Sequence, residues 1–399
     1  MTPKTAVAMS GGLDSSVTAF LLAERGEPVL GLSMLLWDRS EEAASGRCCG
    51  ALDLSDARRV AAQVGIPHYT LRMDEEFRAK VVDPFVADYL AGKTPSPCVR
   101  CNTWIKFDLL LERARSFGAE QVATGHYARI LEGPHGPELH RALDLDKDQS
   151  YYLFELTTKQ LAASRFPLGE MTKEEVRAIA RRAGLVVAEK GESMEVCFVA
   201  SGVQDFVASE AAARPERFPD LPSAGAEIVN SAGQELGRGA PYYRYTVGQR
   251  RGLGVAASER LYVLGVEPAA NRVRVGAEDE LLAEGLVGER LHWIGDPRTF
   301  AAADGSISAT VRIRSRHPGI EAVIRPLPEG GAEVRFAAPQ KGVAPGQAAV
   351  FYRGSRVLGG CWITSALAPA ITSTNSPLSE GRAPNSAASS ESLPLLTSS

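Results

Sequence analysis

The chain has 399 residues, of which 44% are hydrophobic, and its formal net charge is −4 at pH 7. This length exceeds what one hydrophobic core usually organises, so we expect two or three domains. The charge excludes a strongly basic coat for general nucleic-acid binding, although one local positive face is enough for a specific RNA enzyme. Neither a secretory signal nor an apolar run of the ~18 residues that a membrane span needs is present, so we expect a cytoplasmic protein with no membrane partner.

The first two hundred residues alternate short apolar runs with helix-like segments. Buried strands are predicted at 5–9, 28–37, 67–71 and 121–125, and helices at 17–24, 53–64 and 105–117, with Gly26 and Gly118 closing the first and last. Strands and helices in this rhythm predict an α/β fold, in which a parallel sheet is covered by helices on both faces.

Beyond about residue 205 glycines and prolines become frequent, and the apolar runs shorten and alternate. Strands are expected at 261–266, 272–275, 309–313, 332–336 and 348–352. We therefore divide the chain into an α/β catalytic domain at 1–205, a small central β-rich domain at 206–283 and a C-terminal β-barrel at 284–365. The remaining residues, 366–399, are rich in Ser, Pro and Ala without an aromatic residue, which predicts a disordered tail.

The most informative motif is Ser10-Gly11-Gly12-Leu13-Asp14-Ser15-Ser16, which follows the first strand. Its two glycines let the backbone turn tightly and aim several N–H groups at one point. The following helix N-terminus adds partial positive charge, so the motif is suited to a phosphate group. It is neither a Walker A loop nor a Rossmann fingerprint, and on chemistry alone a capped glycine turn remains an alternative.

Cys98 and Cys101 form a Cys-x-x-Cys pair, which is typical of half a zinc site, a redox pair or a nucleophile with a neighbour. No second pair stands at the right distance, which disfavours structural zinc, and we assign no metal to these residues. Arg100 and Lys106 are expected to lower the pKa of a nearby thiol. Cys197, flanked by valine and phenylalanine, is by itself typical of a buried core residue.

Six blocks occur in a fixed order along the chain: the loop at 10–16, Cys101-Asn102, 123–127, 146–152, 245–254 and 345–347. The loop resembles the PP-loop of the N-type ATP pyrophosphatases. The whole set is similar to the tRNA-specific 2-thiouridylases, from Thr5 to about Ile363.

This resemblance implies an adenine-nucleotide alpha-hydrolase-like fold for the first domain, with ATP and Mg²⁺ as the cofactors. Asp14 is then a catalytic residue that helps to position magnesium-bound pyrophosphate. The ATP-binding residues implied are Ala8, Met9, Ser10, Gly11, Gly12, Leu13, Asp14, Ser15, Met34 and Gly125.

The resemblance also implies the reaction. ATP adenylates the C2 oxygen of the wobble uridine of tRNA, and sulfur from a persulfide on Cys197 replaces that oxygen, giving 2-thiouridine, AMP and pyrophosphate. Cys101 is the partner thiol: it either frees hydrosulfide from the persulfide or resolves the bond after the persulfide has attacked C2. Both routes end in a Cys101–Cys197 disulfide, so a reductant is needed, and the sulfur comes from an upstream carrier or a cysteine desulfurase.

By the same resemblance, Ser96, Pro97 and Cys98 form the pocket for the flipped base, and His126 lies beside the reacting centre. The residues implied in tRNA contact are Lys147, Asp148, Gln149, Arg314, Ser315 and Gln347. Two departures stand out: Ser315 replaces the tyrosine that commonly follows the family's arginine, and Glu189-Lys190-Gly191 departs from the usual lead-in to the second cysteine.

Three alternatives remain open. One is a PP-loop ligase or sulfurtransferase that adenylates another carbonyl, against which the two thiols weigh. The second is an iron–sulfur cluster held by Cys98, Cys101 and Cys197, which we do not favour. The third is a non-catalytic RNA-binding protein, which would need neither the complete loop nor both thiols.

Overall fold

The computed structural model describes residues 4–36, 51–191, 196–199, 202–257 and 259–369. The chain separates into two compact units, Met1–Ala368 and Pro369–Ser399, and everything below concerns the first. The predicted tail therefore lies almost wholly outside the described residues, as do Cys48 and Cys49.

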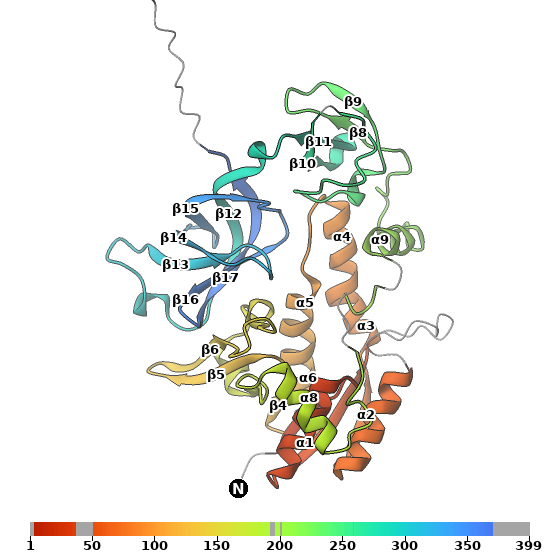
Figure 1. Cartoon of the computed structure of the whole chain (residues 1–399), viewed down its shortest axis with the longest axis vertical. Coiled ribbons are helices and arrows are strands. Elements are labelled where there is room, and N and C mark those ends of the chain that lie inside the picture. The colour runs from red at the N-terminus through yellow and green to blue at the C-terminus, as the bar shows by residue number, and fades with distance from the viewer. Residues whose placement is uncertain (1–3, 37–50, 192–195, 200–201, 258, 370–399) are drawn as a thin grey trace, which may run out of the picture. The chain divides into compact units, whose positions relative to one another are not determined.

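The N-terminal part is built on a five-stranded parallel sheet, visible in red to yellow in Figure 1. Its strands, in spatial order, are β3 (His68–Arg72), β2 (Val29–Leu35), β1 (Thr5–Ala8), β4 (Gln121–Ala123) and β7 (Ser164–Arg165). The first four match the apolar runs in the sequence, so the predicted parallel sheet is confirmed. Short buried strands of this kind are typical of sheets covered on both faces.

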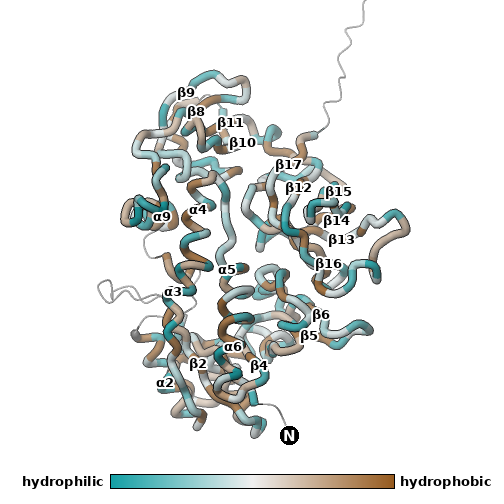
Figure 2. The backbone as a smooth tube through the Cα atoms, turned by 180° about the vertical axis from the view of Figure 1, so that it is seen from behind, coloured by the Kyte–Doolittle hydropathy of each residue, from teal (hydrophilic) through white to brown (hydrophobic). Residues whose placement is uncertain are grey.

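Helices cover both faces of this sheet because alternate strand residues point to opposite sides. Ala6 and Val122 pack into one hydrophobic cluster, whereas Val7 and Ala123 pack into another. The second cluster contains α1 (Leu13–Glu24), α2 (Ala51–Val64) and α8 (Lys173–Arg182). The first contains residues of α3 (Asp74–Phe77), η1 (Arg78–Val82), α4 (Asp83–Leu90), α6 (Leu110–Ser116) and α9 (Val203–Ala212). Figure 2 shows the hydrophobic stretches along α4 in brown.

The helix predicted at 105–117 begins earlier than expected. A continuous helical run starts with α5 (Pro97–Arg100), passes through a nine-residue π-helical stretch, η2 (Cys101–Leu109), and ends with α6. Pro97 stands at the first turn, where its fixed φ suits a helix start and no N–H is missed. Cys101 therefore lies on a helix, at the point where the helix widens; such widened turns are frequent at functional sites.

A four-stranded sheet follows, made of β8 (Glu227–Val229), β9 (Glu235–Arg238), β10 (Tyr262–Glu267) and β11 (Arg272–Gly276). The last part is an antiparallel barrel of β12 (Leu282–Trp293), β13 (Ile307–Arg312), β14 (Ile320–Pro326), β15 (Ala332–Lys341), β16 (Ala348–Arg353) and β17 (Arg356–Leu367). The barrel closes because β12 pairs with both β15 and β17. The predicted small sheet and barrel are confirmed, while the domain boundaries stay predictions.

A hairpin of the N-terminal part, β5 (Ala128–Gly133) and β6 (Gly136–Arg141), extends the barrel sheet through one pairing between Arg356 and His140. Beneath it, Phe107 and Phe154 pack in one hydrophobic cluster with barrel residues such as Val350 and Trp362. The hairpin and this shared cluster fix the barrel against the N-terminal part. Among the described helices, none is long and apolar enough to cross a membrane.

Candidate functional site

The motif at 10–16, called the loop below, runs from the turn after β1 into the first turn of α1 at the carboxyl end of the sheet, where open α/β sheets bind their ligands. Gly12 is the N-cap of α1, and Gly11 has a φ of +75°. A Cβ on Gly11 would lie 2.0 Å from the Asp53 carbonyl oxygen, so no other residue fits there. The Ser10 amide donates to the Ser15 Oγ at 3.2 Å. The loop is thus a tight turn that ends on a helix N-terminus, as the phosphate interpretation requires.

Asp14 is held by two residues that the sequence analysis did not single out. The Tyr127 hydroxyl donates to its Oδ1 at 3.0 Å, and the Lys173 ammonium contacts its two oxygens at 2.7 and 2.9 Å. The Asp14 side chain is one-third exposed. A hard carboxylate oxygen beside a phosphate cradle fits Mg²⁺, provided that Lys173 moves its contacts to the phosphates.

Gly125 follows β4 and touches the start of α1. A Cβ at this position would lie 2.8 Å from the backbone carbon and Cβ of Asp14 and 2.9 Å from the Ser15 nitrogen. The backbone of the neighbouring strand therefore closes directly over the loop, and the position predicted to contact ATP requires glycine.

Gly125→Ala is expected to raise the KM for ATP about 10-fold or more. The added methyl group has to push Asp14 away, and overpacking of this kind costs about 1–3 kcal/mol. Gly191→Ala is the matched control, since no atom of the described residues lies within 4 Å of a Cβ there. Equal KM values for the two variants, measured by pyrophosphate release, would contradict this account of the loop.

The remaining predicted ATP residues surround the loop. Met9 and Leu13 are buried, so they support the loop through packing and offer only their backbone to a ligand. Ala8 and Met34, at the carboxyl ends of β1 and β2, pack against the cluster that also contains Cys101. The nucleotide side of the predicted site therefore borders the same hydrophobic cluster as the thiol side.

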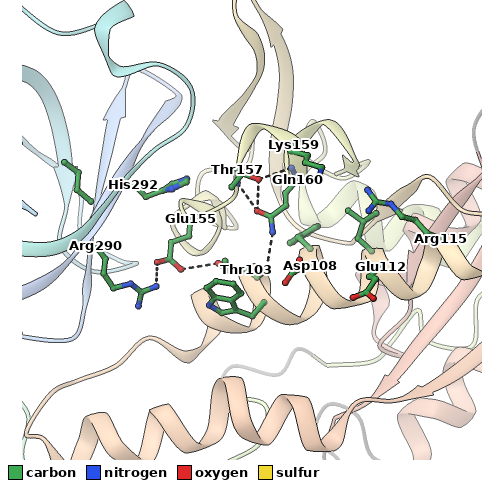
Figure 3. A pocket seen from close by; sticks show the side chains of 14 residues that line it. Thr103, Asp108, Glu112, Arg115, Glu155, Thr157, Lys159, Gln160, Arg290 and His292 are labelled. Atoms are coloured by element: carbon green, nitrogen blue, oxygen red, sulfur yellow. Dashed lines mark hydrogen bonds and ion pairs between the residues drawn. The ribbon is translucent and has the colours of Figure 1, made fainter. Parts of the chain in front are cut away.

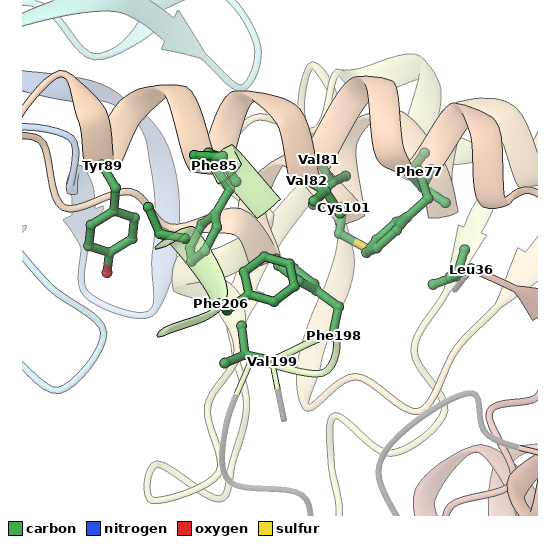
Figure 4. Close-up of a cluster of buried hydrophobic side chains, with 14 of the residues drawn as sticks. Leu36, Phe77, Val81, Val82, Phe85, Tyr89, Cys101, Phe198, Val199 and Phe206 are labelled. Atoms are coloured by element: carbon green, nitrogen blue, oxygen red, sulfur yellow. The ribbon is translucent and has the colours of Figure 1, made fainter. Parts of the chain in front are cut away.

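Cys101 and Cys197 belong to one hydrophobic cluster. Cys101 is 8% exposed and lies inside it, and Cys197 is partly buried and packs against it. Figure 4 shows Cys101 beside Phe77, with Phe198 close to both in the same cluster. Phe198, the residue after Cys197, contacts Phe77, Phe85 and Phe206 at ring-centroid distances of 5.5, 5.3 and 5.3 Å. Phe198 thus anchors the segment that carries Cys197.

The expectation of a lowered thiol pKa is wrong for Cys101 in this structure. Burial raises the pKa of the Cys101 thiol, and the positive charge of Lys106 only partly opposes that shift. The Arg100 guanidinium is turned away and pairs with Asp88 at 2.9 Å. Cys101 is therefore a protonated thiol at neutral pH until substrate or a proton acceptor changes its surroundings.

His126 is held between two aromatic rings. Its ring centroid lies 5.8 Å from those of Phe107 and Phe166, and its Nδ1 shares a 2.7 Å hydrogen bond with the Thr124 hydroxyl. Burial, followed by the charge of Lys106, holds the pKa of His126 well below its usual range. The imidazole is therefore neutral at physiological pH and can offer a hydrogen bond but not a positive charge.

The segment predicted to receive the target base is tied to the barrel. Ser96 and Pro97 are buried and Cys98 is exposed. Two residues earlier, the Thr94 amide donates to the Pro345 carbonyl at 2.7 Å, and the Gln347 Nε2 donates to the Thr94 carbonyl at 2.7 Å. Gln347, predicted to contact tRNA, therefore lies next to the predicted base pocket.

Asp148 holds two arginines together. Its side chain is 0% exposed, and its Oδ2 accepts from Arg141 of β6 at 3.0 Å and from Arg312 of β13 at 3.1 Å. The Ala142 and Ser150 amides occupy the other oxygen. With every acceptor position engaged, Asp148 here orients arginines and does not face the solvent from which RNA would approach.

Lys147 and Gln149 flank this ion pair. The Lys147 amide donates to Asp144, and the Gln149 Oε1 accepts from the Tyr127 amide at 3.0 Å. The Tyr127 hydroxyl in turn donates to Asp14, so Tyr127 connects Gln149 to the ATP loop. Its predicted tRNA contact would therefore lie close to the nucleotide.

Arg314 and Ser315 lie on the barrel, in the turn after β13. Arg314 is exposed, with one 3.4 Å hydrogen bond to the Lys341 carbonyl. Burial raises the pKa of Tyr152, and a hydrogen bond with the Ser315 side chain opposes that shift, as does the charge of Arg316. The hydrogen bond with Ser315 links this turn of the barrel to Tyr152.

A cavity of about 590 Å³ is lined by residues of η2, α6, α7 (Thr158–Ala162) and β12 (Figure 3). Its lining carries charges of both signs: Asp108, Glu112 and Glu155 against Arg115, Lys159 and Arg290. The described lining includes neither the loop nor the two thiols, so this cavity is separate from the candidate site.

The three cysteines of the cluster alternative are not gathered as metal ligands. Throughout the described part of the chain, no group of three or more His, Cys, Asp and Glu side chains is arranged to hold a metal ion. Cys98, Cys101 and Cys197 are all within that part.

Comparison with known proteins gives a consistent result. Residues 3–201 match the family described as tRNA methyl transferase HUP domain. Residues 220–277 match the tRNA methyl transferase PRC-barrel domain, and residues 283–363 match the aminomethyltransferase beta-barrel domain. The tRNA-specific 2-thiouridylase MnmA of Geobacter metallireducens is 50% identical over 371 residues, 90% of this chain and 96% of the relative. That of Rhodospirillum centenum is 45% identical over 390 residues, 95% of this chain and 96% of the relative.

Among solved structures, the U34-tRNA thiolase NcsA of Methanococcus maripaludis is similar with a TM-score of 0.32 and 17% identity, over 54% of this chain and 67% of that one. A likeness of that size supports no argument about this chain.

Proposed function

The chain belongs to the tRNA-specific 2-thiouridylases, and we propose that the loop at 10–16 and the pair Cys101 and Cys197 are the two halves of its active site. It is an ATP-dependent tRNA sulfurtransferase that forms 2-thiouridine. The observation that supports the site assignment best is the cluster that both thiols share with Ala8 and Met34.

The first half removes oxygen. The C2 oxygen of the wobble uridine attacks the α-phosphate of ATP, a new oxygen–phosphorus bond forms, and pyrophosphate leaves toward the N–H groups around Gly12. When bound with ATP, Mg²⁺ neutralises charge on the departing pyrophosphate, and Asp14 is the residue that would hold it. Lys173, now on Asp14, would contact the same phosphates.

The second half installs sulfur. The terminal sulfur of a Cys197 persulfide attacks C2, and AMP leaves with the original oxygen. The Cys101 thiolate then attacks the Cys197 sulfur, leaving the transferred sulfur on the base. In the alternative order, Cys101 first displaces hydrosulfide from Cys197, and hydrosulfide attacks C2. Both orders form one Cys101–Cys197 disulfide, which takes two electrons to reopen.

Two partners follow from this chemistry. A sulfur carrier or a cysteine desulfurase has to load Cys197, and a thiol reductant has to regenerate the pair. Because the reaction requires both thiols to return to the reduced state, we place it in the reducing cytoplasm.

AMP formation is expected to depend on tRNA with uridine at the wobble position. The adenylated atom belongs to the base, so a transcript with adenosine there, which has no C2 carbonyl, should support only background release. The test measures AMP from labelled ATP with each transcript and with free carboxylic acids in place of tRNA. AMP release driven by an acid would favour a PP-loop ligase and contradict the proposal.

A further inference from the structure

Lys190 links two segments that are far apart in the sequence. Its ammonium donates to the Gly11 carbonyl at 2.9 Å, to the Asp53 Oδ1 at 2.6 Å and to the Asp56 Oδ2 at 2.7 Å. Gly11 belongs to the nucleotide loop, and the two aspartates belong to α2. One ammonium thus bridges two carboxylates and the carbonyl of a loop residue, and its own side chain is 31% exposed.

The bond to Gly11 fixes the orientation of a loop peptide. In a trans peptide the carbonyl and the next N–H point in opposite directions. With the Gly11 carbonyl directed at Lys190, the Gly12 N–H is directed away from it. Gly11 itself has a φ of +75° and packs against the Asp53 backbone, so the peptide has little room to turn. Lys190 therefore fixes the direction of the Gly12 N–H, one of the groups that would donate a hydrogen bond to pyrophosphate.

The position of Lys190 in the chain gives this contact a second consequence. Lys190 precedes Cys197 by seven residues, and Phe198 follows it directly. Phe198 is anchored among the aromatic rings of the buried cluster, whereas Lys190 is anchored on the loop. Lys190 and Phe198 thus flank Cys197 in the chain, the first bonded to the ATP loop and the second packed in the cluster that contains Cys101.

We propose that Lys190 is a positioning residue that couples the ATP loop to the Cys197 segment. Its three bonds keep the Gly11–Gly12 peptide in the orientation in which the Gly12 N–H can donate to pyrophosphate, and they tie the chain seven residues before Cys197 to that loop. The proposal rests on the assignment of the loop and of Cys197 made above. It identifies a residue that serves both half-reactions without touching the reacting atoms.

A neighbouring ion pair provides a matched control. Arg181 of α8 pairs with Glu189 at 2.8 Å, one residue before Lys190, with side chains that are 58% and 73% exposed. This pair also tethers the lead-in to Cys197 but, among the described residues, makes no bond to the loop. Exposed pairs of this kind contribute little to stability. If tethering alone were important, its loss would act like the loss of Lys190.

The experiment compares Lys190→Met, Lys190→Arg and Arg181→Met in the full chain. The KM for ATP is measured by tRNA-dependent pyrophosphate release, and 2-thiouridine is quantified by mass spectrometry. Lys190→Met should raise this KM about 10-fold or more, the size expected for a charge-assisted hydrogen bond. It should also lower the 2-thiouridine formed per pyrophosphate released. Lys190→Arg should recover part of both effects, and Arg181→Met should stay within about twofold of the unaltered chain.

Asp56→Asn extends the test in case Lys190→Met does not fold, because it weakens the hold on the ammonium without altering the loop. It should raise the KM for ATP by a smaller factor. An unchanged KM in the folded Lys190 or Asp56 variants, or an equal change in Arg181→Met, would overturn the proposal. Failure of the unaltered chain to thiolate tRNA would instead overturn the proposed function, so the two failures are distinguishable.

Discussion

Cys197→Ser is expected to lower 2-thiouridine formation by at least about 1000-fold, because the hydroxyl cannot carry a persulfide and the reaction loses its sulfur carrier. The adenylation half should survive, since the loop and Asp14 are untouched. We therefore expect tRNA-dependent pyrophosphate release to continue while thiolation stops, with AMP left on the adenylated base. Pyrophosphate and 2-thiouridine are measured in the same reaction, by chromatography of the products of labelled ATP and by mass spectrometry of nucleosides.

Cys361→Ala is the matched control for this result. Cys361 lies in the barrel core and is 0% exposed, so its loss should lower the melting temperature while the folded fraction keeps its activity. If Cys197→Ser thiolated tRNA at the rate of the unaltered chain, the assignment of the persulfide to Cys197 would be wrong.

Cys101→Ser is expected to stop turnover to a similar extent, but at a different point. If the persulfide attacks C2 itself, the sulfur remains bonded to Cys197 and tRNA accumulates as a covalent adduct. If Cys101 must first free hydrosulfide, no adduct forms, and added sulfide should restore thiolation. Gel electrophoresis without reductant separates these outcomes.

The burial of Cys101 adds a pH dependence to this step. Because burial raises the pKa of the thiol, the thiolate fraction is small at neutral pH and grows as the pH rises toward that pKa. The disulfide-forming step should therefore accelerate with pH in single-turnover experiments. Normal multiple turnover by Cys101→Ser would show that another thiol resolves the intermediate.

Local sequence was sufficient to predict the parallel sheet and the barrel. The apolar runs at 5–9 and 348–352 become β1 and β16 because each is long enough for a buried strand and is bounded by turn residues. Local sequence was not sufficient to predict the hairpin β5–β6, because its two prolines and exposed polar residues obscure the alternation of apolar and polar side chains that marks a strand. That hairpin is stabilised by the pairing of His140 with Arg356 of the barrel, which is 216 residues away in the sequence.

In the candidate site, too, features set by local sequence could be predicted, and features set by distant contacts could not. The loop was recognisable because its glycines are required locally, at a positive φ and at a close approach to Asp53. The partners of Asp14, by contrast, come from positions 127 and 173, and no local signal marks them. A threonine and a glutamate at the start of α8 predict a helix N-terminus there, but not that Lys173 reaches the loop.

Charges near a thiol in sequence also proved a poor guide to its pKa. Arg100 is adjacent to Cys101 but pairs with Asp88, and the apolar surroundings of the thiol dominate. Burial and competition between partners are tertiary properties, so a basic neighbour predicts a lowered pKa only where its charge is not already neutralised.

The most direct test of the central claim is mass spectrometry of tRNA after incubation with the chain, ATP and a persulfide donor. The account predicts 2-thiouridine at the wobble position, formed with one AMP per sulfur transferred and absent without ATP or in Cys197→Ser. Unmodified uridine despite AMP release, or 2-thiouridine formed by the Cys197→Ser variant, would contradict it.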